Sequence, residues 1–300
     1  MGAQLRMVRR RIRSVQSTAK ITRAQELIAA SRIIRAQQRL HAAGPYAREL
    51  TRAVEAVVSM SESVDHPLTR PELNPRRVAV VVLTSDRGFC GGFNANLLRE
   101  AQRLRGLLSE RGLAESTYVA GRKGITWHRF RNMPLAEQWS GFSDTPRQSD
   151  AAELTKTLLE AYELPADQGG VDEINIVYTE FVSMLTQRPV VRRLLPLEIQ
   201  ETEEAPAGPL PSYDFEPSSE EVLDALLPWY VESRLFHALL ESAASEIAAR
   251  RRAMKSATDN ANELIEQLSR EANKARQAEI TQEISEIVGG ANALADATRE

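Results

Sequence analysis

Apolar residues recur in alternating steps of three and four along the first part of the chain. One run covers residues 5–22, and after a polar break at Glu26 a second run covers residues 29–43. This heptad spacing predicts a helix about 60 Å long or more, with one apolar seam. The Gly44-Pro45 pair that follows predicts a kink or a break. The seam consists of Leu5, Val8, Ile12, Val15, Ala19, Thr22, Ala29, Ile33, Ala36, Leu40 and Ala43.

The C-terminal part of the chain carries a similar pattern, and residues 229–288 contain neither Gly nor Pro. Residues 218–221, Ser-Ser-Glu-Glu, predict a capped helix start with acids in the first turn. The Gly289-Gly290 pair predicts the end of the periodic stretch. After Ala272 the seam slips, which indicates a change in supercoil or in partner. Before the slip it runs through His237, Leu240, Ala244, Ile247, Arg251, Met254, Thr258, Ala261, Ile265 and Leu268, and after it through Ile280, Ile284 and Ile287.

Both seams are rich in Ala, Thr, Ser and charged residues, where a self-sufficient coiled coil would carry Leu, Ile or Val. Small seam residues allow close approach of two helices but bury little apolar area. We therefore expect a modestly stable helix pair that a larger partner surrounds. An ordinary helical hairpin is the simpler alternative, but it does not account for the length.

The middle of the chain alternates between strand and helix patterns. A β-branched run at residues 77–84 predicts a buried strand, and a Gly-rich turn at residues 85–93 follows it. This alternation predicts an α/β unit with a mostly parallel sheet covered by helices. A connection with five prolines, residues 196–217, leads to the C-terminal helix. The other predicted elements are helices at 94–111, 123–131 and 151–162, and strands at 118–120, 173–181 and 189–197, the last two paired antiparallel.

Charge divides this chain of 300 residues unevenly, although its formal net charge is only −3. Residues 1–52 contain 12 basic and two acidic residues, a net of +10, whereas residues 53–217 and 218–300 are acidic. A basic arm is typical of contact with nucleic acid or with an acidic surface. It is equally consistent with a solvated face, or with a complement to the chain's own acidic C-terminal part.

The motifs of common catalytic sites are missing from the sequence. Gly92 is followed by Phe and Asn, so the Gly-rich turn lacks the lysine of a phosphate-binding loop, and its glycines do not match a dinucleotide-binding loop. A tight strand-to-helix turn that needs positive φ is the favoured interpretation. Asp86 and Arg87 could form a local ion pair in it. The single cysteine, Cys90, excludes a disulfide framework, and a buried structural thiol is expected there. The four histidines match no metal-binding spacing. We expect no catalytic site, no metal and no bound cofactor in this chain.

Two further observations concern the cellular environment. The longest apolar run, residues 78–83, is too short to span a bilayer. The N-terminal residues lack the apolar stretch of a signal peptide. We expect a soluble protein that faces the cytosol.

Four stretches of the chain together resemble the γ subunits of bacterial F-type ATP synthases. They are residues 12–24 (IRSVQSTAKITRA), 85–94 (SDRGFCGGFN), 252–261 (RAMKSATDNA) and 275–289 (ARQAEITQEISEIVG). The resemblance covers essentially the whole chain, and the motifs occur in the family's order. It implies an α/β fold with a central Rossmann-like domain beside an antiparallel coiled coil of the N- and C-terminal helices. The corresponding domains would be residues 1–60, 75–200 and 218–300, with a Pro-rich connection at 201–217.

The resemblance also implies a function. In this family the coiled coil is the central rotor shaft inside a ring of α and β subunits. Its base binds the ε subunit and the membrane-embedded c-ring, and proton flow turns it to drive ATP synthesis at the β subunits. The chain would thus be a peripheral protein at the cytoplasmic face of the bacterial cell membrane, without a transmembrane segment.

Family motifs assign contact residues by position. The resemblance places Lys20, Arg23, Gln25, Arg276, Gln277, Thr281 and Gln282 against loops of the catalytic subunits. It places Tyr213, Asp214, Phe215 and Glu216 at the foot that faces the c-ring and ε. The apolar end of the last seam, Ile280, Ile284, Ile287 and Val288, would suit a smooth bearing, because hydrophobic contact is non-directional.

Two other classes of function remain as alternatives. A coiled-coil nucleic-acid binder would use the basic arm and would bind DNA with a steep dependence on salt. A Rossmann-type enzyme with helical extensions would bind nucleotide as an isolated chain. The C-terminal motifs argue against the first class, and the missing phosphate-binding motif argues against the second.

Overall fold

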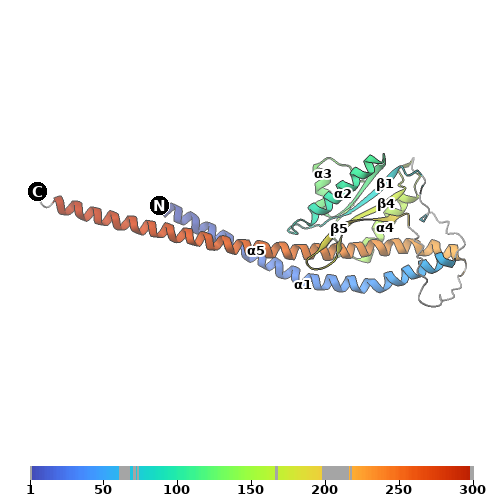
Figure 1. Cartoon of the computed structure of the whole chain (residues 1–300), viewed down its shortest axis with the longest axis horizontal. Helices are drawn as coiled ribbons and strands as arrows, with labels where there is room; N and C mark the ends of the chain where they lie inside the picture. Colours follow the sequence, from blue (N-terminus) through green and yellow to red (C-terminus); the bar gives the residue numbers. More distant parts are fainter. Residues whose placement is uncertain are drawn as a thin grey trace. The chain divides into compact units, whose positions relative to one another are not determined.

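The computed structural model describes residues 2–60, 68–69, 72, 74–165, 168–197, 216 and 218–297. The chain divides into two compact units. Unit 1 comprises Met1–Ile28 and Arg251–Glu300, and unit 2 comprises Ala29–Arg250. Two helices, α1 (Gly2–Met60) and α5 (Ser219–Ala297), contribute to both units. Figure 1 shows α1 in blue and α5 in orange to red, and each is a single continuous helix.

Helix α1 follows the predicted seam, but it does not break at the Gly44-Pro45 pair. Both residues are helical, and the helix continues for another 15 residues to Met60. A proline in a helix removes one hydrogen bond, and its ring crowds the Cβ of the preceding residue. Gly44 has no Cβ, which relieves that crowding. Leu50 and Val57, both buried, anchor the continuation by packing.

Helix α5 begins where the sequence predicts and ends later. The Ser218 hydroxyl accepts a hydrogen bond from the Glu221 amide at 3.2 Å, as expected of a helix cap. The helix contains Pro228 and continues through Gly289-Gly290 to Ala297, so the predicted end at this glycine pair is wrong. The pair weakens the helix by about 1 kcal/mol per residue relative to alanine, but alanine-rich sequence follows it.

Unit 2 contains a five-stranded sheet with the order β3-β2-β1-β4-β5. The first four strands are parallel, and β5 pairs antiparallel with β4, which confirms the predicted α/β class and the antiparallel last pair. Strand β2 begins four residues before the prediction, and β3 was not predicted because three residues, Glu-Gln-Trp, give no periodic signal. The strands are β1 (Arg77–Leu83), β2 (Ala114–Ala120), β3 (Glu137–Trp139), β4 (Glu173–Phe181) and β5 (Gln187–Leu195).

Helices cover both faces of this sheet. Helices α2 (Phe93–Glu110) and α3 (Arg122–Phe130) pack on the face that bears Val78, Val80 and Val82. Helix α4 (Gln148–Glu163) and α5 pack on the opposite face, together with Val57 of α1. Alternate residues of β1 therefore enter two different cores, which explains why the whole strand is apolar.

Within unit 2, α1 and α5 lie side by side and antiparallel. Ile33 packs against Ile247 in one apolar cluster, whereas Gly44 lies near His237. Higher numbers on α1 thus meet lower numbers on α5. The predicted connection at 201–217 lies outside the described residues, apart from Glu216, so its boundaries stay a prediction.

Candidate functional site

In unit 1 the seam between α1 and α5 contains a buried polar contact. The hydroxyls of Thr22 and Thr258 lie 2.7 Å apart, and both side chains are buried. Each hydroxyl also lies within hydrogen-bond distance of a carbonyl of its own helix, at Ala19 and Met254. The seam of unit 1 therefore combines this polar contact with small residues and with the buried apolar side chains of Leu5, Met254 and Leu268.

Glu26 belongs to this seam and does not interrupt it. Its side chain is buried, and its carboxylate accepts a hydrogen bond from the Arg23 guanidinium at 2.8 Å. The sequence pattern treated Glu26 as a polar break, because a carboxylate is rarely buried without a partner. Arg23, one turn earlier, provides that partner.

The residues that the resemblance assigns to subunit contacts are all exposed on the two helices. On α1 these are Lys20, Arg23 and Gln25. On α5 the exposed side chains bond only within their own helix: the Thr281 hydroxyl donates to the Gln277 carbonyl at 2.9 Å, and Gln282 donates to Glu286 at 2.9 Å. Arg276 and Gln277 are exposed as well. These polar groups are available to a partner, and their contact roles stay a prediction.

The predicted bearing residues are also exposed. Ile280, Ile284, Ile287 and Val288 have between 45% and 70% of their surface open to solvent. From Ile280 to Gly289 every residue of α5 is exposed, and in Figure 1 this end of α5 runs beyond the start of α1. Four large apolar side chains in one exposed stretch are typical of an interaction surface.

The predicted foot lies mostly outside the described residues. Tyr213, Asp214 and Phe215 are not described, and Glu216 is exposed. Their assignment to the c-ring and ε therefore stays a prediction.

In unit 2, helix α5 crosses the edge of the sheet where a ligand would normally bind. Open α/β sheets bind ligands outside the carboxyl ends of their strands, where the strand order reverses, here between β1 and β4. Ser242 donates a hydrogen bond at 3.5 Å to the carbonyl of Leu83, the last residue of β1. Ser245 donates to the carbonyl of Thr179 in β4 at 3.0 Å. Side chains of α5 thus use backbone groups that line this crevice.

A buried ion pair continues the same contact. Arg250 binds the Glu246 carboxylate at 2.6 Å and donates to the carbonyls of Arg87 and Gly88, each at 3.3 Å. Burial raises the pKa of Glu246 to about 6, although Arg250 opposes this shift. No periodic pattern in the sequence singles out Ser242, Ser245, Glu246 and Arg250 as a group. Their signal is the run of small residues at 242–245, Ser-Ala-Ala-Ser, which lets a helix approach a backbone closely.

The Gly-rich turn after β1 is a structural turn. Gly91 has a φ of 57°, as expected of a turn that needs positive φ. The Cys90 thiol is buried, and burial raises its pKa, which agrees with the expected structural role.

The predicted pair of Asp86 and Arg87 does not form. The Asp86 carboxylate instead accepts hydrogen bonds from the amides of Arg122, Gly141 and Ser143, so it ties the turn after β1 to the start of α3 and to the loop after β3. Arg87 lies 3.6 Å from Asp144. The Asp86 side chain is only 7% exposed, and the Arg122 guanidinium, 3.6 Å from its carboxylate, takes the place expected of Arg87.

Within the described residues, no three His, Cys, Asp or Glu side chains are grouped so that they could hold a metal ion. Among the described helices, none has both the length and the apolar character needed to cross a membrane.

Comparison with known proteins places the whole chain in one group. A sequence model described as ATP synthase matches residues 4–294. The "ATP synthase gamma chain" of Acidothermus cellulolyticus is 60% identical over 295 residues, which cover 98% of each chain. The protein of the same name from Thermobifida fusca is 57% identical over 99% of each chain.

Solved structures agree with the fold. A chain in a structure of the Euglena gracilis mitochondrial ATP synthase, comprising OSCP, F1 and c-ring, superposes with a TM-score of 0.70 and 15% identity, covering 100% of this chain and 97% of that one. A chain in a structure of the central stalk and c-ring of the Tetrahymena thermophila enzyme gives 0.56 at 23% identity, over 79% and 99% of the two chains.

Proposed function

This chain belongs to the ATP synthase gamma chain family, and we propose that it is the central rotor shaft of a proton-translocating F-type ATP synthase. The shaft couples rotation of the c-ring to ATP synthesis at the β-subunit catalytic sites, and it regulates ATPase activity and proton flow. The observation that carries this proposal is the 60% identity to a gamma chain along 98% of both sequences.

The physical character of the terminal helices supports a shaft that turns inside a sleeve. The helices are joined by a thin seam with a Thr22–Thr258 contact, and α5 ends in a stretch with four exposed large apolar residues. Hydrophobic contact has no preferred direction, so an apolar tip can turn without breaking a set of directional bonds. A polar segment just before it, from Arg276 to Gln282, would engage the surrounding subunits.

The proposed partners are the α and β subunits around the coiled coil, and the ε subunit and c-ring at its base. The chain would thus be a peripheral component at the cytoplasmic face of the cell membrane. The shaft has an asymmetric surface, so it would contact the three-dimensional surroundings of each catalytic site differently as it turns. Rotation would therefore favour the different conformational states of each catalytic site in turn.

We infer that the chain contributes no catalytic site and binds no cofactor in its α/β domain. The crevice at the strand-order reversal is crossed by α5, whose Ser242, Ser245 and Arg250 bond to its backbone. A nucleotide there would have to displace a buried helix. The same observation argues against a Rossmann-type enzyme.

The test is MgATP hydrolysis by purified α and β subunits of a bacterial ATP synthase, with and without this chain, after size-exclusion chromatography. We expect the chain to co-elute with the α and β subunits and to switch on sustained turnover. A chain that neither co-elutes nor activates would contradict the shaft assignment.

Variants of the exposed polar segment sharpen this test. Arg276→Ala combined with Gln282→Ala should lower turnover of the complex at least several-fold and leave the melting temperature of the chain unchanged, because both side chains are exposed. Arg99→Ala, an exposed arginine on α2, is the control and should leave both quantities unchanged.

A further inference from the structure

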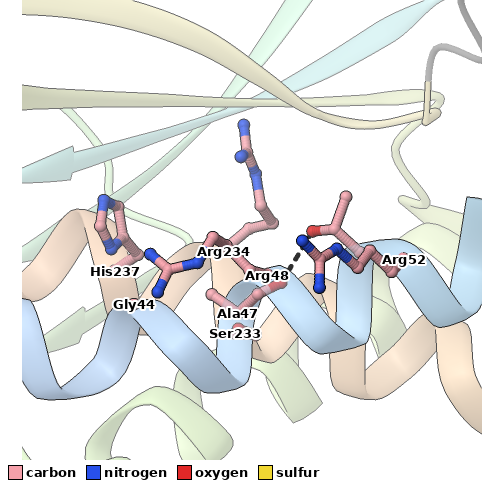
Figure 2. A pocket seen from close by; sticks show the side chains of 8 residues that line it. Gly44, Ala47, Arg48, Arg52, Ser233, Arg234 and His237 are labelled. Atoms are coloured by element: carbon pink, nitrogen blue, oxygen red, sulfur yellow. Dashed lines mark hydrogen bonds between the residues drawn. The ribbon is translucent and has the colours of Figure 1, made fainter. Parts of the chain in front are cut away.

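Between α1 and α5 in unit 2 lies a hollow of about 370 Å³ that the shaft function does not use. Figure 2 shows its side chains, which come from both helices. A hollow of this size falls in the range of small-molecule sites. We call it the arginine hollow, and it is lined by Gly44, Ala47, Arg48, Thr51, Arg52, Ser233, Arg234 and His237.

The arginine hollow carries an uncompensated positive charge. Three exposed arginines, Arg48, Arg52 and Arg234, line it, and among the described residues no carboxylate does. Arg52 is paired with Glu49 at 2.7 Å, but no described carboxylate lies within ion-pair distance of Arg48 or Arg234. Arg48 and Arg234 therefore bring two unpaired positive charges to the hollow, and an anion bound between them would attract both.

His237 also lines the hollow, and its Nε2 lies 3.9 Å from a carboxylate oxygen of Glu241. Burial lowers the pKa of His237, and the Arg234 charge lowers it further, so both favour the neutral ring. Its Nδ1 atom is buried without a hydrogen-bond partner among the described residues. A neutral imidazole can donate a hydrogen bond to an anion without adding a further charge.

The absence of a side chain at Gly44 leaves room for the Arg48 guanidinium. A Cβ at Gly44 would stand 3.1 Å from Nη1 of Arg48, closer than ordinary contact, so the guanidinium lies directly over this glycine. In Figure 2 the Arg48 side chain runs back along α1 toward Gly44. The glycine that relieves crowding before Pro45 therefore also leaves room for a charged group at the rim.

We propose that the arginine hollow binds a compact polyanion with two or more phosphoryl groups. Arginine presents a planar fork of donors that matches phosphate oxygens, and several forks around one hollow suit an anion with many acceptors. A carboxylate side chain of a protein partner brings only one charge. Apart from the arginines and His237, the described lining consists of glycine, alanine, serine and threonine, and the aromatic Tyr46 and Phe236 line the adjoining hollow of about 180 Å³ instead.

This inference goes beyond the shaft function and does not depend on it. The bound anion would be an effector that contacts residues 44–52 of α1 and 233–237 of α5. This site is separate from the crevice that α5 crosses. Bound anion would also stabilise the helix pair, since a ligand of the native state raises its stability.

The experiment is isothermal titration of the purified full-length chain with inorganic phosphate, pyrophosphate, tripolyphosphate and ADP, at low and at physiological salt. We expect one saturable site, with affinity rising from phosphate to tripolyphosphate and falling as salt rises. ADP binding near the affinity of pyrophosphate would indicate that the phosphoryl groups alone are recognised. Arg48→Gln and Arg234→Gln should each weaken tripolyphosphate binding about tenfold.

Two variants separate the site from general charge and from folding. Arg39→Gln removes an exposed arginine of α1 that does not line the hollow, and it should bind tripolyphosphate as the wild type does. Arg48→Lys keeps the positive charge but loses the planar fork of donors, so we expect weaker tripolyphosphate binding at an unchanged melting temperature.

Three results would overturn the proposal. The first is no saturable binding of tripolyphosphate at low salt. The second is an equal loss of affinity in Arg39→Gln and Arg48→Gln, which would show only general charge attraction. The third is tighter binding of a polyglutamate peptide than of tripolyphosphate, which would assign the hollow to the carboxylates of a protein partner.

Discussion

Helix α5 lies in two contrasting environments along its length. From Ser242 to Arg250 every side chain is buried, whereas from Ile280 to Gly289 every residue is exposed. The buried stretch reads Ser-Ala-Ala-Ser-Glu-Ile-Ala-Ala-Arg and is mostly small. The exposed stretch carries three isoleucines and a valine. In this helix, burial follows from small side chains that allow close approach, and large apolar side chains mark a surface that the chain leaves uncovered.

The largest expected effect contrasts one apolar truncation in each environment. Leu235→Ala removes a fully buried side chain from the core between α5 and the sheet, and it should lower the free energy of unfolding of unit 2 by about 3 kcal/mol. Ile284→Ala removes an exposed side chain and should change stability by less than about 0.5 kcal/mol. Urea denaturation of the full-length chain, followed by tryptophan fluorescence, measures the change in unit 2.

Turnover of the complex should depend on the exposed side chain, although the stability of the chain does not. We expect Ile284→Ala to lower turnover of the complex with α and β subunits while its urea midpoint stays that of the wild type. Equal destabilisation by the two variants would mean that the end of α5 is covered within the chain itself, and the contrast between the two stretches would fail.

Removing Arg250 should have an effect nearly as large. Arg250→Ala leaves the Glu246 carboxylate buried without its partner and breaks the contacts to the carbonyls of Arg87 and Gly88. Loss of one member of a buried pair costs about 3 kcal/mol or more. The neighbouring Arg251 is exposed, so Arg251→Ala is a matched control with little expected effect. Similar melting temperatures for the two variants would show that the buried pair does not stabilise this contact.

The buried carboxylate also predicts a pH dependence. Burial raises the pKa of Glu246 to about 6, above the 4.5 of the unfolded chain, in spite of Arg250 and with Asp144 adding to the rise. The group therefore binds protons more strongly in the folded state, and its contribution is complete below pH 4.5 and lost as pH rises through 6. The shift corresponds to about 2 kcal/mol.

Glu246→Gln removes this titration and keeps an acceptor for Arg250. Between pH 4.5 and 7 the stability of the variant should decline by about 2 kcal/mol less than that of the wild type. Glu266→Gln, at an exposed position of α5, should follow the wild type. Parallel curves for the wild type and Glu246→Gln would refute the assignment of this titration to Glu246.

The sequence predicts the parts of this molecule that follow a regular period. Residues 173–181 form β4 as predicted, and the α1 seam from Leu5 to Ala43 is buried or half-buried throughout. The features that the pattern does not predict depend on contacts between residues far apart in the sequence. The helix runs through Gly44-Pro45 because packing beyond it outweighs the local cost, and Asp86 binds loops that lie 36 to 57 residues away.

The candidate site likewise has one part that the sequence predicts and another that it does not. Exposure of Arg276, Gln277, Thr281 and Gln282 could be anticipated from the resemblance and the polar pattern. The Ser242–Arg250 contact and the arginine hollow could not, because each combines residues more than 150 positions apart. Hydrophobic periodicity contains no information about contacts between residues so far apart in the sequence.

The smallest expected effect concerns the seam of unit 1, where one hydroxyl contact lies among buried apolar residues such as Met254 and Leu268. The hydroxyls of Thr22 and Thr258 lie 2.7 Å apart, and either can donate to the other. Thr22→Val and Thr258→Val each remove this hydrogen bond, so the double variant should lose little more than one single variant. A double-mutant cycle by thermal unfolding, followed by far-ultraviolet circular dichroism, should give a coupling free energy of about 1 kcal/mol. Thr18→Val, at an exposed position whose hydroxyl bonds only to Ser14, is the control for the helix itself. Strictly additive effects would mean that each threonine acts through its own helix, and that packing without this hydrogen bond holds the two helices together.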